Sequence, residues 1–155
     1  MVMSLISLGG AVGWAKYGVE NVQNAATANQ QVTFNKAAMQ YVQDNAVVIA
    51  QNSTATTPVT ITPAMLRNTG YLPAGFSDTN AFGQTWQVQV LQPSPGSLQT
   101  LVTSQNGQAI SAKQLVQIAS LAGAQGGFIP YGNQAGDASM NANTAYAPAV
   151  RGLCR

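Results

Sequence analysis

Charged side chains are scarce in this chain of 155 residues, in which six Lys and Arg and four Asp and Glu make up 6% of the sequence. Soluble domains usually carry roughly 25%. The six cations are scattered, and the formal net charge is only +2. Because a phosphate-binding surface needs several clustered cations, this distribution argues against direct nucleic-acid binding.

Histidine is absent, and cysteine occurs once, at Cys154. One cysteine cannot form an internal disulfide, and no CxxC pair or zinc-type spacing is present, so we predict no metal site and no cofactor. Three interpretations of Cys154 stay open: an incidental thiol, a disulfide with another chain, or a disulfide with a stretch beyond this sequence.

Groups suited to catalysis are equally few. Ser111 and Lys113 form an S-x-K triplet, which we interpret as a helix cap and a solvated lysine because no second serine motif accompanies it. The four acids are far apart in the sequence, and nothing in it brings two of them together: Glu20, Asp44, Asp78 and Asp137. We therefore predict that the chain has no catalytic residue and is not an enzyme.

An uncharged run opens the sequence, MVMSLISLGGAVGWA, and Lys16 is the first charged residue. As a helix this run would be about 22 Å long, shorter than the roughly 30 Å hydrocarbon core of a bilayer. It fits the inner part of a membrane helix that starts before this sequence, or a buried helix, although helices of soluble domains are rarely apolar on every face. The residues that we assign to a membrane or filament-core helix are Val2, Met3, Leu5, Ile6, Leu8, Gly9, Gly10, Val12, Gly13 and Trp14.

The glycines of this run have three open interpretations. Gly9 and Gly13 are four residues apart, a spacing that lets helices approach closely in lipid. Glycine also lowers helix propensity by about 1 kcal/mol, so the run could melt locally, or a buried helix could simply tolerate it. Trp14 and Tyr17 lie beside the first charge, where aromatic residues mark a membrane interface or pack in an ordinary way.

An amphipathic pattern follows from Gly18 to about Gln51, with apolar residues three and four apart. Continuous with the apolar run, this helix would approach 75 Å, whereas a compact domain of this size is roughly 30 Å across. One half must therefore project. The predicted apolar stripe contains Val22, Ala25, Ala26, Ala28, Phe34, Ala38, Met39, Tyr41, Val42, Ala46, Val48 and Ile49, and Asn24, Gln30, Lys36, Gln43 and Asp44 lie between.

A polar loop, QNSTATTPVTITP, is predicted to end this long N-terminal helix, which we call the spine, and to lead into a short helix. Thr62 suits its N-cap, Pro63 its first turn, and Gly70 a left-handed end. Such a helix is too short to be stable alone, so it must pack on another part of the protein. We expect residues 62–76 to clamp the head, which is the part of the chain after the spine, against the spine. The residues assigned to this head-clamp segment are Met65, Leu66, Gly70, Tyr71, Leu72 and Phe76.

Two alternating segments, 85–92 and 97–105, predict an antiparallel hairpin joined by PSPG. A second helix is predicted over 111–123, and GFIPYG, residues 127–132, predicts a short edge strand. The fold class is therefore α+β, with a long projecting N-terminal helix packed on a small antiparallel sheet. Its expected divisions are a spine helix 1–51, with an apolar half 1–17 and an amphipathic half 18–51, and a head 52–155 with an irregular tail 134–155.

TTPVTITPAMLRNTGYLPAGFSDTNAFGQ, residues 56–84, resembles the constant N-terminal region of shufflon-type minor pilins, the tip adhesins of type IVb conjugative pili. That family has a Thr-rich loop, a Met-Leu-basic-Asn-Thr-Gly-aromatic-Leu segment, Gly-Phe, Thr-Asn and Gly-Gln. LQTLVTSQNG and KQLVQIASLAGAQGGFI are similar to the strand and helix that follow. The resemblance spans most of residues 1–132, and residues 65–84 are its most specific part.

The resemblance implies a structural pilus subunit, of the minor tip-associated kind, that supports cell contact or conjugation. It implies other pilin subunits as partners, the bacterial inner membrane before assembly, and afterwards the pilus surface, where the chain could meet a recipient cell. A major pilin of the shaft, a pseudopilin of a secretion system and a membrane-anchored periplasmic binding module remain alternatives.

One departure concerns the start of the chain. Prepilins carry a short basic leader and usually a glutamate as the fifth mature residue, whereas position 5 here is Leu5. The chain is thus expected either to begin inside the mature protein or to diverge at its start, and no processing site is assigned.

Overall fold

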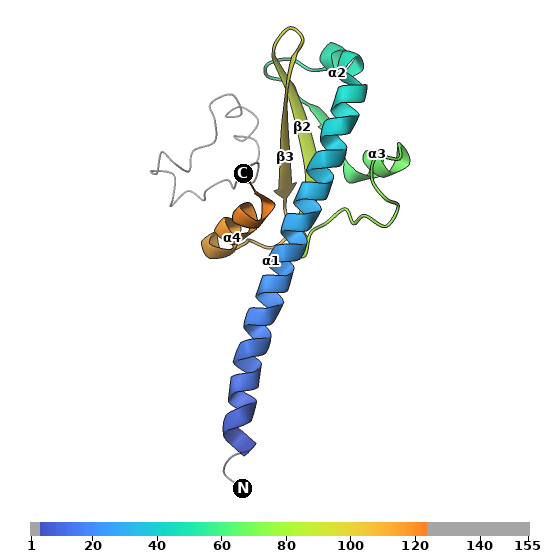
Figure 1. Ribbon diagram of the computed structural model, residues 1–155. Coiled ribbons are helices and arrows are strands. Elements are labelled where there is room, and N and C mark those ends of the chain that lie inside the picture. The colour runs from blue at the N-terminus through green and yellow to red at the C-terminus, as the bar shows by residue number, and fades with distance from the viewer. Residues whose placement is uncertain (1–3, 124–155) are drawn as a thin grey trace, which may run out of the picture.

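The computed structural model describes the backbone of residues 4–123 and the side chains of residues 18–123. A single long helix, α1 (Ser4–Asp44), carries a small head on its C-terminal half and extends well beyond it (Figure 1). At 1.5 Å per residue its 41 residues span about 60 Å. The predicted α+β architecture with a projecting N-terminal helix is confirmed.

The spine is interrupted near its C-terminal end, where we predicted a single helix to about Gln51. Instead α1 ends at Asp44 and a second helix, α2 (Ala46–Asn52), begins after Asn45. The side-chain amide of Asn45 donates to the carbonyl of Tyr41 at 2.9 Å, alongside its own backbone N–H at 3.0 Å. Such local side-chain bonding competes with regular helix geometry and accounts for the break.

The sheet has three antiparallel strands in the order β1-β2-β3: β1 (Val59–Ile61), β2 (Thr85–Ser94) and β3 (Ser97–Gln105). The predicted hairpin is confirmed, and Gly96 in its turn has a φ of +79°. The prediction of an unbroken loop before the short helix was wrong, because β1 lies within it. With three residues, β1 is too short to show the alternation of apolar and polar residues that indicates a strand. Only its pairing with β2 identifies it as one.

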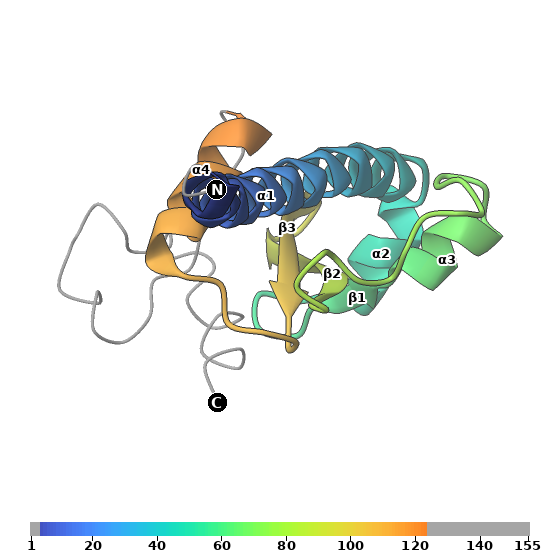
Figure 2. The ribbon, with the colours of Figure 1, turned by 90° about the horizontal axis from the view of Figure 1, so that it is seen from below.

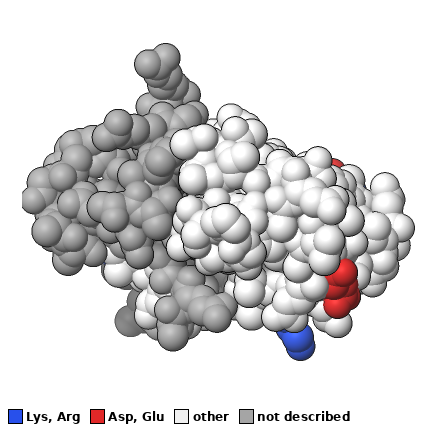
Figure 3. Space-filling view, turned by 90° about the horizontal axis from the view of Figure 1, so that it is seen from above, with Lys and Arg blue, Asp and Glu red and all other residues white. Residues whose placement is uncertain are grey.

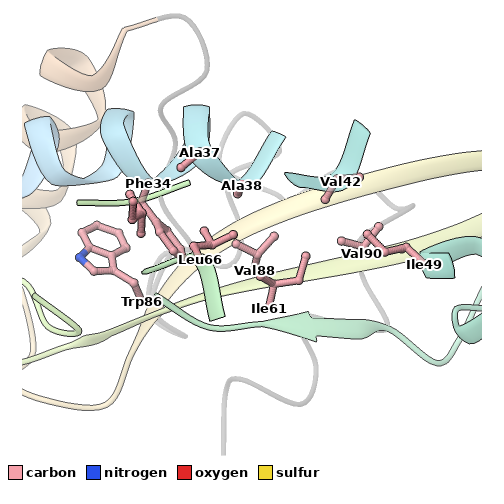
Figure 4. Close-up of a cluster of buried hydrophobic side chains, with 11 residues drawn as sticks. Phe34, Ala37, Ala38, Val42, Ile49, Ile61, Leu66, Trp86, Val88 and Val90 are labelled. Carbon is pink, nitrogen blue, oxygen red and sulfur yellow. The ribbon is translucent and has the colours of Figure 1, made fainter. Parts of the chain in front are cut away.

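The main core forms where α1 crosses one face of the sheet (Figure 2). Alternation along β2 points Trp86, Val88 and Val90 at this face. Figure 4 shows these side chains meeting Phe34 and Val42 from α1. The full cluster of buried residues is Phe34, Ala37, Ala38, Val42, Ile49, Ile61, Leu66, Leu72, Trp86, Val88 and Val90.

A second cluster of buried apolar residues lies where α4 (Ala112–Ala122) packs on α1. The members of this cluster are Ala28, Phe82, Ile110 and Ile118. The hydroxyl of Ser111 accepts a hydrogen bond from the Gln114 N–H, which confirms our interpretation of this serine as a helix cap. Gly123 ends the helix with a φ of +86°.

The predicted apolar stripe was wrong at four positions, since Val22, Ala26, Met39 and Val48 are exposed. At the level of α4 the contrast is sharp, because Val22 is 69% exposed whereas Asn24, assigned to the polar side, is 1% exposed. Asn24 donates to the side-chain oxygen of Gln117 in α4 at 2.8 Å. The position of α4, which the helical period cannot reveal, therefore decides which side of α1 is buried.

Several predictions fall on residues that the structure does not describe. The predicted strand 127–132, the tail 134–155 and Cys154 lie outside the described residues, as do the side chains assigned to the membrane or filament core. The backbone from Ser4 onward is helical through the uncharged run. Among the described residues, no helix combines the length and the apolarity needed to cross a membrane.

Candidate functional site

The head-clamp segment begins with α3 (Pro63–Asn68), a helix whose two ends are both stabilised locally. The Thr62 hydroxyl accepts a hydrogen bond from the Met65 N–H at 3.3 Å, and Pro63 occupies the first turn. Gly70 follows in a left-handed conformation with a φ of +82°. The next two backbone N–H groups both donate to the Leu66 carbonyl, so the chain turns back toward α1.

The returning chain contacts α1 through aromatic side chains. The Phe76 ring stacks on Phe34 with centroids 6.0 Å apart, and the Tyr71 and Tyr41 rings meet at 84° with centroids 5.3 Å apart. Leu66 and Leu72 are buried in the main core, whereas Met65 is exposed. Five of the six assigned residues therefore form or support the contact between head and spine, either directly or, for Gly70, through the turn.

Arg67 closes the segment on its outer side. Its guanidinium donates to the Phe76 carbonyl at 2.9 Å and forms an ion pair with Asp78 at 2.5 Å. The Asp78 side chain is 54% exposed, so the pair contributes little free energy, on the order of 1 kcal/mol or less. Its structural effect is to hold α3 against the loop that leads into β2.

Replacing Gly70 with alanine is expected to lower the free energy of unfolding by about 1–2 kcal/mol, because a side chain at positive φ is strained. A Cβ here meets no atom within 4 Å, so no clash adds to this cost. Urea unfolding followed by tryptophan fluorescence measures it. Gly75→Ala in the same segment, also without contacts, is the control and should change stability by less than about 0.5 kcal/mol. Equal effects of the two changes would contradict the role of Gly70.

Tyr71 also connects the segment to α1 electrostatically. Its hydroxyl donates to the Asp44 carboxylate at 2.7 Å. This hydrogen bond is the main reason why the pKa of Tyr71 is raised, with smaller contributions from burial and from the negative charge of Asp44. The neutral phenol is the form that the folded protein favours.

The stabilisation from the Tyr71 hydrogen bond should therefore be complete below about pH 10, the ordinary tyrosine pKa, and should be lost as pH rises through the higher folded value. In urea unfolding, the stability difference between the wild type and Tyr71→Phe should stay constant up to that pH and shrink above it. Asp44→Asn should lower the Tyr71 pKa in an ultraviolet titration. A difference that stays constant up to pH 12 would contradict this coupling.

The side of α1 that faces away from the main core carries two exposed apolar residues, which we call the outer ridge: Val32 and Met39. These two residues are seven positions apart, close to two whole helical turns, so they lie along one side of α1. A shallow depression of about 410 Å³ runs over Val32, Lys36, Met39 and Gln43. Few charges interrupt the surface of the head, as the view from above in Figure 3 shows.

Chemistry-bearing groups are dispersed over the described residues. In that part of the chain, no three His, Cys, Asp or Glu residues come together in a group that could hold a metal ion. Asp44 and Asp78 bind Tyr71 and Arg67 in separate contacts. The absence of a cofactor stays a prediction.

Sequence reasoning missed the polar pairs that join the elements. Asn24 and Gln117 are 93 residues apart, and Asp44 and Tyr71 are 27 residues apart. We had placed Asn24 and Asp44 on the polar side of the spine as ordinary solvated residues. No local pattern marks such pairs, because their partners are chosen by the fold.

A helix that packs its C-terminal half on a small antiparallel sheet and extends beyond the head defines a pilin-like α+β subunit. Residues 17–149 match the family described as bacterial shufflon protein, N-terminal constant region. The chain belongs to this shufflon protein family, and the resemblance seen in the sequence is confirmed.

Individual relatives agree with the family match. Shufflon proteins A′, B and D′ of Escherichia coli are each 35% identical to the chain over 138 residues. The matched region covers 87% of this chain but only 32%, 31% and 30% of those relatives, respectively. The chain thus spans about a third of their length. No solved structure matches it.

Proposed function

We propose that the chain is a structural subunit of a type IVb pilus that assembles through its N-terminal helix. The observation that carries this proposal is a long projecting helix fastened to a head by a continuous core and by the head-clamp segment. Membership of the shufflon protein family supports the same function. The proposed role of the chain is therefore mechanical.

The proposed path of assembly starts with the apolar half, residues 1–17, in the bacterial inner membrane. These residues then leave lipid and pack among the helices of neighbouring subunits. Packing geometry decides the gain in this step, because lipid is as apolar as the side chains that it surrounds. Farther along the helix, the outer ridge supplies the surface that meets other subunits.

A minor subunit at the pilus tip, in contact with a recipient cell, is the more specific role that we propose. The family match favours it over a major pilin of the shaft or a pseudopilin. Electron microscopy of sheared filaments labelled with antibody to this chain distinguishes these positions. Label at filament ends supports a tip subunit, and label along the whole length contradicts it.

The assembly proposal is tested by charging the outer ridge with Val32→Asp and Met39→Asp together. We expect at least a tenfold loss of the chain from sheared filaments, because two buried, unpaired carboxylates oppose packing between subunits. The matched control, Val116→Asp with Leu121→Asp, charges two exposed apolar residues of α4 instead.

Neither pair should change the unfolding temperature of the subunit by more than a few degrees, because all four side chains are exposed. Wild-type amounts of the charged-ridge variant in filaments would contradict the proposed surface. Equal loss of both pairs would show a general effect of charge and would also contradict it.

A further inference from the structure

Among the helices of the head, α4 lies nearest to the projecting half of α1 (Figure 1). Gln117 of α4 accepts the hydrogen bond from Asn24, whereas Ile118 belongs to the same apolar cluster as Ala28, which is one turn farther along α1. The side of α4 that carries Gln117 therefore points toward the N-terminal end of α1.

Two more residues share this side of α4, because Lys113 and Leu121 stand four residues before and after Gln117. Both are exposed, Leu121 at 59%. Lys113 is the only charged residue of α4, and it forms no ion pair with a described side chain. On α1, just N-terminal to the contact with α4, Val19 and Val22 are exposed as well. We call these four residues the lower rim: Val19, Val22, Lys113 and Leu121.

We propose that the lower rim rests on the surface of the lipid bilayer before the subunit assembles. The contact depends on the proposed function, in which residues 1–17 lie in the inner membrane. With α1 along the bilayer normal, the helix rises about 10 Å from residue 17 to Asn24, and the near side of α4 lies about 5 Å closer. The interfacial layer extends roughly 5–8 Å beyond the hydrocarbon, so the lower rim reaches it.

The chemistry of the lower rim suits a bilayer surface. Its three apolar side chains would leave water at the depth where amphipathic helices bury theirs, between headgroups and acyl chains. Lys113 adds attraction to anionic lipids, and Lys16 and Lys113 together outnumber Glu20, the one acid in this part of α1. The lower rim also begins only two residues beyond the segment assigned to the membrane, which favours lipid over another protein as its partner.

This contact limits the tilt of the head while the outer ridge stays clear of the membrane. Val32, the nearer residue of the outer ridge, lies about 22 Å beyond residue 17 along α1. Residues 1–17 hold the chain in the bilayer with or without the contact. Charging α4 should therefore change the position of the head and leave the amount of chain in filaments unchanged, as the α4 control pair requires.

The test places a fluorescent dye on the lower rim of the full chain, in vesicles of phosphatidylethanolamine and phosphatidylglycerol. Leu121→Cys is combined with Cys154→Ser, so that a single thiol carries the dye. Val47→Cys in the same background is the reference, because Val47 is 72% exposed on α2, at the other end of the head (Figure 1). We expect lipids with a spin-labelled headgroup to quench the dye at position 121 at least threefold more than the dye at position 47.

A change of charge tests the contribution of Lys113. Lys113→Gln should lower the quenching at position 121 by about twofold or more, because it removes the attraction to the anionic lipid. Gln51→Glu changes the net charge by the same amount on an exposed residue of α2 and should leave the quenching unchanged. Circular dichroism checks that each variant is folded.

The outcomes separate this contact from the proposed function. Equal quenching at positions 121 and 47, in a chain that floats with the vesicles, would overturn the contact and leave the membrane step of the proposed function intact. A chain that does not float with the vesicles would contradict the membrane step and the contact with it. A dye at position 121 that is shielded from aqueous iodide but not quenched by the labelled lipid would mean that protein covers the lower rim, which also overturns the proposal.

Discussion

Replacing Phe34 with alanine is expected to lower the free energy of unfolding by about 3–5 kcal/mol, the usual cost of truncating a fully buried phenylalanine. The ring has no exposed surface and meets both Phe76 and Trp86, with centroid distances of 6.0 and 6.1 Å. Its removal leaves a cavity at the point where α1, the head-clamp segment and β2 join. Since small domains are stable by only about 5–15 kcal/mol, much of the stability would be lost.

Urea unfolding followed by tryptophan fluorescence measures this loss. Val32→Ala is the matched control, because Val32 lies on the same helix but is exposed on the outer ridge. Its effect should stay within about 0.5 kcal/mol. A Phe34→Ala variant as stable as Val32→Ala would show that the head does not depend on the spine for its core.

The second large effect is expected from Gly107→Ala. Gly107 has a φ of +65° and follows Asn106, itself at a φ of 62°, in the turn after β3. A Cβ at Gly107 would lie 2.5 Å from the carbonyl carbon of Gly83 and 2.6 Å from the backbone nitrogen of Gln84. Backbone atoms cannot swing aside as a side chain can, so the two loops must separate. We expect a loss above about 3 kcal/mol, well beyond the cost of positive φ alone.

Gly96→Ala separates these two causes. Gly96 also has a positive φ, +79°, but a Cβ there meets nothing within 4 Å. It should cost about 1–2 kcal/mol, the price of the left-handed conformation alone. Thermal unfolding of both variants, monitored by circular dichroism, provides the comparison, and equal losses would mean that the approach of the loops at Gly107 is loose.

Elements with local signals could be predicted from the sequence. Thr62, Pro63 and Gly70 mark both ends of α3, and Ser111 and Gly123 mark α4 in the same way. In β2, the alternation of Trp86, Val88 and Val90 with glutamines identified the strand and its core face. Each of these signals concerns residues that are neighbours along the chain. The elements that they mark can therefore be predicted without knowledge of the tertiary structure.

The candidate site was only partly predictable. The head-clamp segment was predicted because a short, well-capped helix needs a support, but its contacts with Phe34, Tyr41 and Asp44 were not predicted. The outer ridge was missed for a related reason. Met39 fits an apolar stripe by spacing, and the helical period cannot say which of two apolar sides will be covered.

The sequence by itself determined that this protein has a spine longer than any globule of its size, a capped α3, a hairpin and an uncharged polar surface. Only the tertiary structure decided that β1 is a strand, that Asn24 is buried and Val22 exposed, and that Asp44 binds Tyr71. The physical reason is the distance along the chain over which each property is decided. Backbone conformation and chain length depend on neighbouring residues, whereas burial and pairing depend on which distant elements come into contact, and that choice is made by the packing of the whole head.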